Sequence, residues 1–205
     1  MKNKKEIYQK IALLLEKKLI GKKVIAFPGG RSMKGIYTEL KKKNINWSNV
    51  HIFMVDERMV SINNKESNFK LLKDNLLDFI DIPKDNVHPY LKDNVKYLNE
   101  LKKVGGKFNI VVLSSGEDGH IAGLYPNHHS IKNNSKYFIS MNDSPKLPRK
   151  RMSSSRKLIE NSDFSILLFL GKEKKEAYRK YKDKNVTIED CPAKIVNKNK
   201  VIIKT

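Results

Sequence analysis

The sequence predicts an α/β fold with an open, mostly parallel β-sheet and helices on both faces of the sheet. Short apolar runs without polar alternation recur along the chain, as is typical of strands that are buried on both sides. Segments with helical periodicity stand between these runs, as expected for crossover connections. Polar clusters directly follow three of the predicted strands, at the edge of the sheet where such folds bind their ligands.

The composition indicates one globular unit with a strongly basic surface. The chain has 205 residues, of which 39% are hydrophobic, and 42 Lys+Arg against 22 Asp+Glu give a formal net charge of +20. A chain of this length can bury its own core, so we expect a single domain over residues 1–205. The lysines are spread along the whole chain and do not form the basic stripe with interleaved aromatic residues that is typical of nucleic-acid binding. We therefore expect an anionic small-molecule ligand and no nucleic-acid partner.

Targeting and metal-binding signals are sparse in this sequence. No apolar run approaches the roughly 20 residues that a membrane span requires, and the charged start of the chain is not followed by an apolar segment. Cys191 is the single cysteine, so an internal disulfide and a cysteine-based zinc site are excluded. We expect a soluble cytoplasmic protein without membrane contact, metal or cofactor, and the sequence leaves its oligomeric state open.

The first part of the chain predicts a helix, a strand and a second helix. Residues 4–20 place Ile7 and Ile11 on one helical face. Residues 24–27 form a short apolar run that ends at a Pro-Gly-Gly sequence, and residues 33–43 regain helical periodicity. This alternation is the pattern of one strand-to-helix unit of a parallel sheet.

The same alternation continues through the rest of the chain. Apolar runs again end on polar clusters, and helical periodicity returns after most of them. The further predicted elements are strands at residues 51–55, 108–113, 137–141, 164–170 and 201–203, and helices at residues 69–79 and 172–181.

The first polar cluster, Gly29-Gly30-Arg31-Ser32, lies between a predicted strand and a helix. Glycines there let backbone N–H groups approach an anion, and the helix N-terminus favours negative charge, which indicates phosphate binding. A simple chain reversal is the alternative. Gly30 and Gly35 have the spacing of a Walker loop, but Ile36 follows where lysine is required, so nucleotide hydrolysis is not expected.

The second cluster, Asp56-Glu57-Arg58, closes a strongly apolar strand. We interpret it as a polar loop at the carboxyl edge of the sheet, where Asp56 and Arg58 are candidate substrate-binding residues. An arginine there could grip a phosphate or carboxylate at two points, because its guanidinium is planar. A solvated loop without function is the alternative.

The third cluster contains Gly116, Asp118 and His120. Imidazole titrates near neutral pH, and a neighbouring carboxylate can orient it, so His120 is a candidate general base with Asp118 as its partner. Glycines flank this histidine and leave room for a substrate. The other histidines lie in predicted strands or in a loop without such a context: His51, His88, His128 and His129.

The fourth cluster is a loop at residues 143–153 that carries two prolines and four basic side chains. Proline stiffens a loop, and basic groups held in this way suit a phosphorylated substrate, with Lys146 and Arg151 as candidates. A basic surface loop is the alternative interpretation.

Together and in this order, the clusters resemble the 6-phosphogluconolactonase family, over about residues 22–201. The matching segments follow the family's phosphate loop, its Asp-Glu-Arg, its Asp-Ser-Asn, its Asp-Gly-His-Thr-Ala-Ser-Leu-Phe-Pro, its Ser-Pro-Lys and its late Gly-x-x-Lys segment. They are residues 29–33, 56–58, 66–68, 118–126, 144–151 and 171–174. Two departures are Arg31, in place of a small hydroxyl residue, and Ser114-Ser115, where a Leu-Gly pair is usual.

The resemblance implies a modified Rossmann-like fold, shared with glucosamine-6-phosphate deaminases and ribose-5-phosphate isomerases. It also implies hydrolysis of 6-phosphoglucono-1,5-lactone to 6-phosphogluconate, in the oxidative pentose phosphate pathway. His120 would activate water with help from Asp118, and backbone N–H groups around Gly116 or Gly30 would stabilise the developing oxyanion. The implied substrate-binding residues are Gly29, Gly30, Arg31, Ser32, Asp56, Arg58, Gly116, Lys146 and Arg151.

Two other interpretations remain open at this point. A deaminase or isomerase of the glucosamine-6-phosphate type would recruit Asp56 or Glu57 at C2 of its substrate. Deaminases typically have Asp-Glu-Tyr and Phe-Asn-Glu-Pro, whereas this chain has Asp-Glu-Arg and Leu124-Tyr125-Pro126. A non-catalytic phosphosugar- or nucleic-acid-binding protein would keep the loops and the charge without needing His120.

Overall fold

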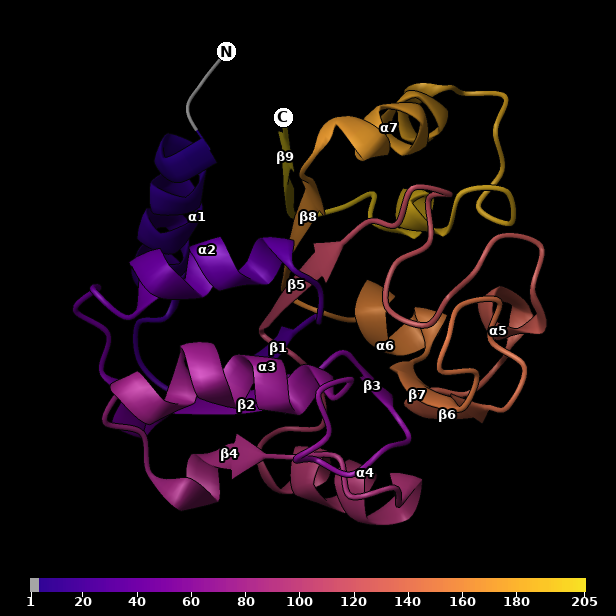
Figure 1. The fold of residues 1–205 in the computed structure, drawn as a ribbon. Coiled ribbons are helices and arrows are strands. Elements are labelled where there is room, and N and C mark those ends of the chain that lie inside the picture. The colour runs from indigo at the N-terminus through magenta and orange to yellow at the C-terminus, as the bar shows by residue number, and fades with distance from the viewer. Residues whose placement is uncertain (1–3) are drawn as a thin grey trace.

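The computed structural model describes residues 4–205, which form a central sheet of six parallel strands with helices on both faces (Figure 1). Across the sheet the strands are β4 (Val87–His88), β2 (Val50–Met54), β1 (Lys23–Phe27), β5 (Ile110–Ser114), β8 (Phe164–Phe169) and β9 (Lys200–Lys204). If these six strands are numbered 1 to 6 in chain order, their order across the sheet is 3-2-1-4-5-6, which is the order of a doubly wound sheet. The predicted α/β class is confirmed, and the winding reverses between β1 and β5.

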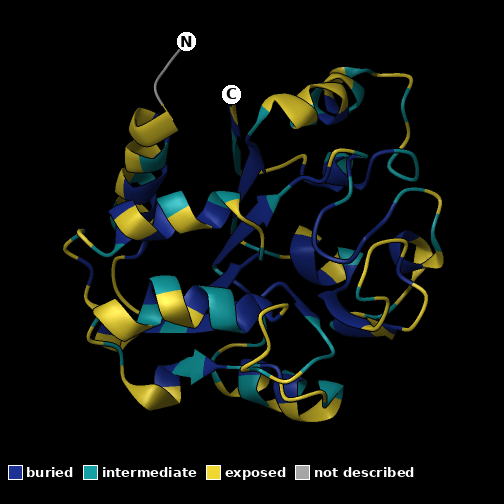
Figure 2. Ribbon diagram, in the orientation of Figure 1, coloured by how far each residue is buried: buried dark blue, intermediate teal, exposed yellow. Residues whose placement is uncertain are grey.

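Alternate residues of each strand are buried on opposite faces of the sheet, which explains why the strands read as continuous apolar runs. Ile25 and Phe27 pack with the helices of one face, and Val24 and Ala26 pack into the core of the other. The first face is covered by α1 (Lys4–Lys18), α2 (Ser32–Leu40) and α3 (Asn68–Asn75). The second is covered by α4 (Asn94–Lys103), α6 (Arg156–Glu160) and α7 (Lys175–Lys182). Figure 2 shows the strands buried and the outer sides of the helices exposed.

The predicted helices are present but shorter than expected. The helix expected over residues 33–43 ends at Leu40, and the one expected over residues 69–79 ends at Asn75 before a 3₁₀ turn. The helix expected over residues 172–181 begins with a 3₁₀ turn and becomes α-helical only at Lys175. Leu76 follows the end of α3 and is buried in the core, so the apolar pattern extends past that helix and overstates its length.

No prediction was made for three helices, α4, α5 (His129–Lys132) and α6, or for one strand of the parallel sheet, β4. α4 is mostly polar, and only Tyr97 and Leu101 of its residues are buried, so its apolar periodicity is weak. Its start carries a recognisable signal, because the Asp93 carboxylate accepts hydrogen bonds from the N–H groups of Val95 and Lys96. α6 and β4 have five and two residues, too few for a periodic pattern.

A second, antiparallel sheet lies beside the main one and corrects two expectations. Its strands, in order, are β3 (Asp56–Arg58), β7 (Arg151–Ser154) and β6 (Phe138–Met141). Asp56–Arg58 is therefore a strand, not a loop, and Arg151 begins a strand instead of sitting within the basic loop. The predicted strand at residues 137–141 belongs to this sheet and not to the parallel one. The pattern of charged residues did not predict β3 and β7, because strands pair through backbone N–H and C=O groups, which are the same whatever the side chains are.

The short helix α5 (His129–Lys132) follows β5 of the main sheet and precedes β6 of the second sheet along the chain. No helix within residues 4–205 is long and apolar enough to span a bilayer.

Candidate active site

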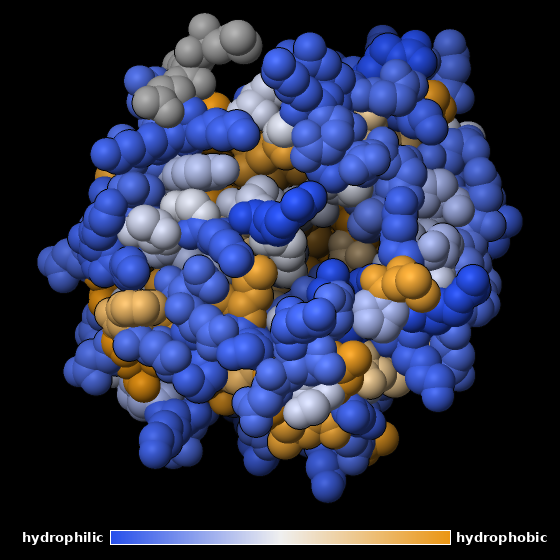
Figure 3. All heavy atoms as spheres, in the orientation of Figure 1, coloured by the Kyte–Doolittle hydropathy of each residue, from blue (hydrophilic) through white to orange (hydrophobic). Residues whose placement is uncertain are grey.

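A cavity of about 310 Å³ opens at the carboxyl ends of β1 and β5, where the winding of the sheet reverses. Figure 3 shows this face of the molecule, with mostly hydrophilic side chains around a central hollow. A larger hollow of about 890 Å³ adjoins the cavity between α1 and β9 and shares Arg31 and Ser32 with it, but does not include His120. The cavity wall includes all but one of the predicted site residues: Gly29, Gly30, Arg31, Ser32, Asp56, Arg58, Gly116, His120, Lys146 and Arg151.

The turn from β1 into α2 presents backbone N–H groups at one end of the cavity. Gly30 has φ +101, a conformation that residues with a side chain rarely adopt. A Cβ on Gly29 would lie 1.9 Å from Oδ1 of Asn68, so glycine is required for this close approach. Within residues 4–205, the N–H groups of Gly30, Arg31 and Ser32 have no hydrogen-bond acceptor. Unpaired N–H groups at a helix N-terminus attract anions.

Asp56 and Asn68 form the floor of this end of the cavity. The Asn68 amide donates to the backbone oxygen of Asp56 at 2.9 Å and to its Oδ2 at 3.2 Å. Nη1 of Arg151 lies 3.9 Å from the same carboxylate oxygen. The three buried side chains hold β3, β7 and α3 together under the cavity.

Glu57 stands between the cavity residues Asp56 and Arg58 in the chain, but its carboxylate points to the start of α3. Its carboxylate accepts hydrogen bonds from the N–H groups of Arg58, Asn68 and Phe69, each at 2.7 Å, and from the Ser67 hydroxyl at 3.0 Å. Burial raises the pKa of this carboxyl, although these hydrogen bonds act in the opposite direction. With its oxygens used to cap α3, Glu57 does not line the cavity, so of the two carboxylates considered for deaminase chemistry only Asp56 reaches it.

The two arginines of the second sheet, Arg58 and Arg151, differ in how many of their guanidinium groups' donors are hydrogen-bonded to the protein. Arg151 is buried, and its guanidinium donates to the backbone oxygens of Pro148 at 3.0 Å and Leu147 at 2.8 Å. It therefore holds the basic loop in place. Arg58 donates from Nη1 to the backbone oxygen of Glu66 at 2.5 Å, whereas its buried Nε has no acceptor in the described part of the chain. The Arg58 guanidinium thus makes fewer hydrogen bonds to the protein than that of Arg151, and its side chain lines the cavity.

His120 and Asp118 form a close pair beside the cavity. Nδ1 of His120 lies 2.6 Å from Oδ1 of Asp118, and Asp118 also accepts from the His120 N–H at 3.1 Å. Asp118 lies behind the histidine and is the one predicted site residue outside the cavity wall. Burial alone would raise the pKa of Asp118, but the hydrogen bonds and charge of His120, together with Lys146 at 3.9 Å, hold it well below its usual range. The carboxylate therefore stays ionised and fixes the imidazole.

Gly116 makes room for this pair. A Cβ at this position would lie 2.0 Å from Nδ1 of His120 and 2.7 Å from Oδ1 of Asp118. Its own N–H donates to the backbone oxygen of His120 at 2.8 Å. The N–H of Gly116 itself is therefore engaged, so an oxyanion donor in this segment would have to be a neighbouring N–H group.

Tyr125 and Asn68 line the cavity, but neither was predicted as a site residue. The ring of Tyr125 lies 4.9 Å from that of His120 between centroids. Its hydroxyl is buried next to Ser144, and burial raises the pKa of this tyrosine although the interaction with Ser144 acts in the opposite direction. A signal existed for both: Asn68 matches the family's Asp-Ser-Asn, and Tyr125 adds a hydroxyl where the family pattern has phenylalanine.

Comparison with known proteins identifies relatives over nearly the whole chain. Residues 2–203 match the family model described as glucosamine-6-phosphate isomerases/6-phosphogluconolactonase. The 6-phosphogluconolactonase of Borreliella burgdorferi is 32% identical over 186 residues, which cover 85% of this chain and 79% of the relative. That of Thermotoga maritima is 30% identical over 175 residues, which cover 82% and 78%.

Solved structures share the fold. The crystal structure of the Thermotoga maritima 6-phosphogluconolactonase superposes with a TM-score of 0.80 at 26% identity, covering 98% of this chain and 92% of the other. A monomeric glucosamine-6-phosphate deaminase superposes with a TM-score of 0.83 at 22% identity, covering 100% and 95%. Because proteins of both activities superpose equally well, the fold does not distinguish them, whereas the relatives at 30% identity or more named above are lactonases.

Proposed function

Because the chain belongs to the glucosamine-6-phosphate isomerase/6-phosphogluconolactonase family, we propose that it hydrolyses 6-phosphoglucono-1,5-lactone to 6-phosphogluconate. One observation carries the proposal: an imidazole held by an ionised carboxylate borders a cavity whose other walls present unpaired N–H groups and cationic side chains. The imidazole with its carboxylate suits activation of water, and the N–H groups and cationic side chains suit binding of an anionic substrate.

The chemistry requires one base and one water molecule. His120 takes a proton from water through its Nε2 as the water oxygen bonds to C1 of the lactone, and later returns it to the ring oxygen as the C1–O bond breaks. Asp118 keeps the proton of Nδ1 in place and stabilises the imidazolium that forms between these steps. A positioned base of this kind contributes roughly 10²- to 10⁴-fold to the rate.

We assign the charged groups of the cavity to two ends of the substrate. Arg31, Arg58 and Lys146 bind the phosphate, with the N–H groups of the α2 N-terminus beside them. A backbone N–H group around Gly116 or Gly30 that faces C1 stabilises the negative oxygen that develops there. Arg151 acts indirectly, because its guanidinium is committed to the loop that carries Lys146. Binding the remote phosphate places the lactone over His120 and lowers the barrier at C1.

The test is the rate of 6-phosphogluconolactone hydrolysis above the spontaneous background, measured in the presence of a chelator. Wild type, His120→Ala and His51→Ala are compared, since His51 lies away from the cavity and controls for loss of a histidine. We expect acceleration in wild type and His51→Ala and its loss in His120→Ala. Wild-type rates equal to the background would overturn the proposal, and release of ammonia from glucosamine-6-phosphate would then be assayed.

We also propose that residues 1–205 act as one domain in the cytoplasm. Residues from Pro28 to Lys174 contribute to a single cavity, which supports one functional unit. Cys191 is buried as a free thiol, which suits a reducing compartment. Cell fractionation with an antibody against the chain tests the location, and recovery in a membrane or secreted fraction would contradict it.

A further inference from the structure

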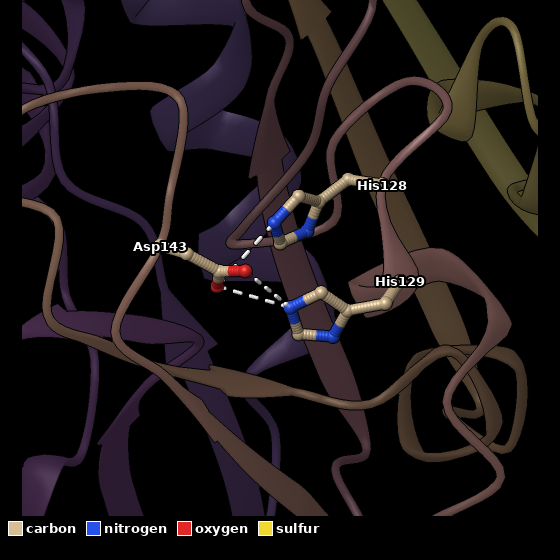
Figure 4. Close-up of side chains that lie close together, drawn as sticks. All are labelled: His128, His129 and Asp143. Carbon is tan, nitrogen blue, oxygen red and sulfur yellow. Dashed lines mark hydrogen bonds and ion pairs between the residues drawn. The ribbon is translucent and has the colours of Figure 1, made fainter.

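Three potential metal ligands converge outside the active-site cavity: His128, His129 and Asp143 (Figure 4). The two histidines stand at the start of α5, and Asp143 lies in the loop between β6 and β7. Nε2 of His129 lies 3.0 Å from each oxygen of the Asp143 carboxylate, and Nε2 of His128 lies 3.5 Å from its Oδ1. One ligand atom from each residue lies within 4.8 Å of the other two. Neither histidine has a sequence context that distinguishes it from an ordinary loop residue.

We propose that these three side chains bind a divalent transition-metal ion of the zinc class. Zinc bonds of about 2.0–2.1 Å in a tetrahedral site place ligand atoms about 3.4 Å apart, and the two distances to Asp143 Oδ1, 3.0 and 3.5 Å, bracket that value. Imidazole nitrogens favour zinc, cobalt, nickel and copper. Magnesium and calcium prefer oxygen ligands, of which this site offers one carboxylate on a chain of net charge +20.

The environment of His128 supports its role as a ligand. Its Nε2 is buried, faces Asp143 at ion-pair distance and has no hydrogen-bond partner within the described residues. Its Nδ1 lies 3.0 Å from the Ser130 hydroxyl and 3.2 Å from the Ser130 N–H. In the metal-bound form Nδ1–H donates to the hydroxyl, which leaves the Nε2 lone pair for the ion. The Ser130 N–H then loses its acceptor, a cost that the metal bond must exceed.

A bound ion would connect α5 to the loop that borders the active site. Asp143 directly precedes the segment whose Lys146 and Leu147 line the cavity, and the side chains of His129 and Asp143 are 57% and 59% exposed without the ion. The ion would replace a solvated ion pair with a cross-link between two segments. It takes no part in the hydrolysis, so the binding test below does not depend on the proposed function.

The test is titration of the tag-free, chelator-treated full chain with Co²⁺ and with Zn²⁺. Co²⁺ bound by nitrogen and oxygen ligands in a tetrahedral site gives an intense visible absorption, and Zn²⁺ should displace it. The variants are His129→Ala and Asp143→Asn, and the second keeps the size of the side chain and hence the fold. His51→Ala is the matched control, since it removes a histidine outside the cluster.

We expect one ion per chain in wild type and His51→Ala, and at least about tenfold weaker binding in each cluster variant. Zn²⁺ should also slow tryptic cleavage of the loop after Lys146 in wild type but not in His129→Ala. Absence of tetrahedral Co²⁺ in wild type, or equal affinity in wild type and both cluster variants, would overturn the proposal. The second result would place the ion elsewhere, for example at His120 and Asp118.

Discussion

Two of the imidazole–carboxylate pairs in the described part of the chain, His120–Asp118 and His129–Asp143, have different surroundings although their chemistry is the same. In the pair His120–Asp118 the side chains are 21% and 33% exposed and the contact is 2.6 Å, whereas in His129–Asp143 they are 57% and 59% exposed at 3.0 Å. The first pair borders a cavity with anion-binding groups, and the second lies on the outer surface. Both histidines have a carboxylate partner, so the partner alone does not make a histidine a candidate base. The cavity and the anion-binding groups around His120 do.

Removal of each carboxylate charge in turn tests whether the two pairs differ in function. Asp118→Asn should lower kcat by roughly 10²- to 10⁴-fold, because the amide can favour the wrong tautomer of His120 and cannot stabilise its charged form. Asp143→Asn should leave kcat within about twofold in metal-free buffer. Steady-state lactonase kinetics measure both, and equal loss in the two variants would contradict the distinction.

The space around His120 is the next difference to test. Gly116→Ala would place a Cβ 2.0 Å from Nδ1 of His120, so the ring must move and lose its alignment with the cavity. We expect kcat to fall by about 10²-fold, the effect of a misplacement of about 1 Å. A thermal melt shows whether the variant is folded. Wild-type kcat in a folded Gly116→Ala would show that the position of the ring is not critical.

The phosphate end of the cavity should respond in a different kinetic parameter. Arg58→Ala removes a guanidinium that lines the cavity, so it should raise KM by about tenfold or more with little change in kcat, as expected for a charged hydrogen bond worth about 1.5–3 kcal/mol. Arg179→Ala, on the exposed side of α7, is the control and should change neither parameter. A fall in kcat with unchanged KM would argue against phosphate binding by Arg58.

The smallest expected effect is on stability against pH. Because folding lowers the pKa of Asp118, its ionised form stabilises the folded state above the unfolded pKa of about 4, and this stabilisation is lost as the pH falls through the folded value. The difference in unfolding free energy between wild type and Asp118→Asn should therefore shrink as the pH falls below about 4. The same difference for Asp143→Asn should be smaller, because water screens that exposed carboxylate. Urea unfolding at several pH values measures both.

Local sequence was sufficient to predict much of the fold and of the candidate site. Five of the parallel strands could be found because both faces of the sheet are buried, which makes each strand continuously apolar. The turn after β1 could be recognised because glycines precede a helix. Ten of the eleven predicted site residues line one cavity, since the carboxyl ends of parallel strands meet at the same edge of a sheet.

Contacts between distant segments could not be found in this way. Asp56 pairs with Ser153 in the second sheet, Arg151 binds loop carbonyls, and the N–H of Gly116 is engaged by His120. His129 and Asp143 are 14 residues apart, and nothing in either segment shows that their side chains meet. Whether a residue is buried could be predicted from the sequence, because burial follows the polarity of its own side chain. Which backbone groups pair and which side chains converge depends on how the packed elements are placed in space.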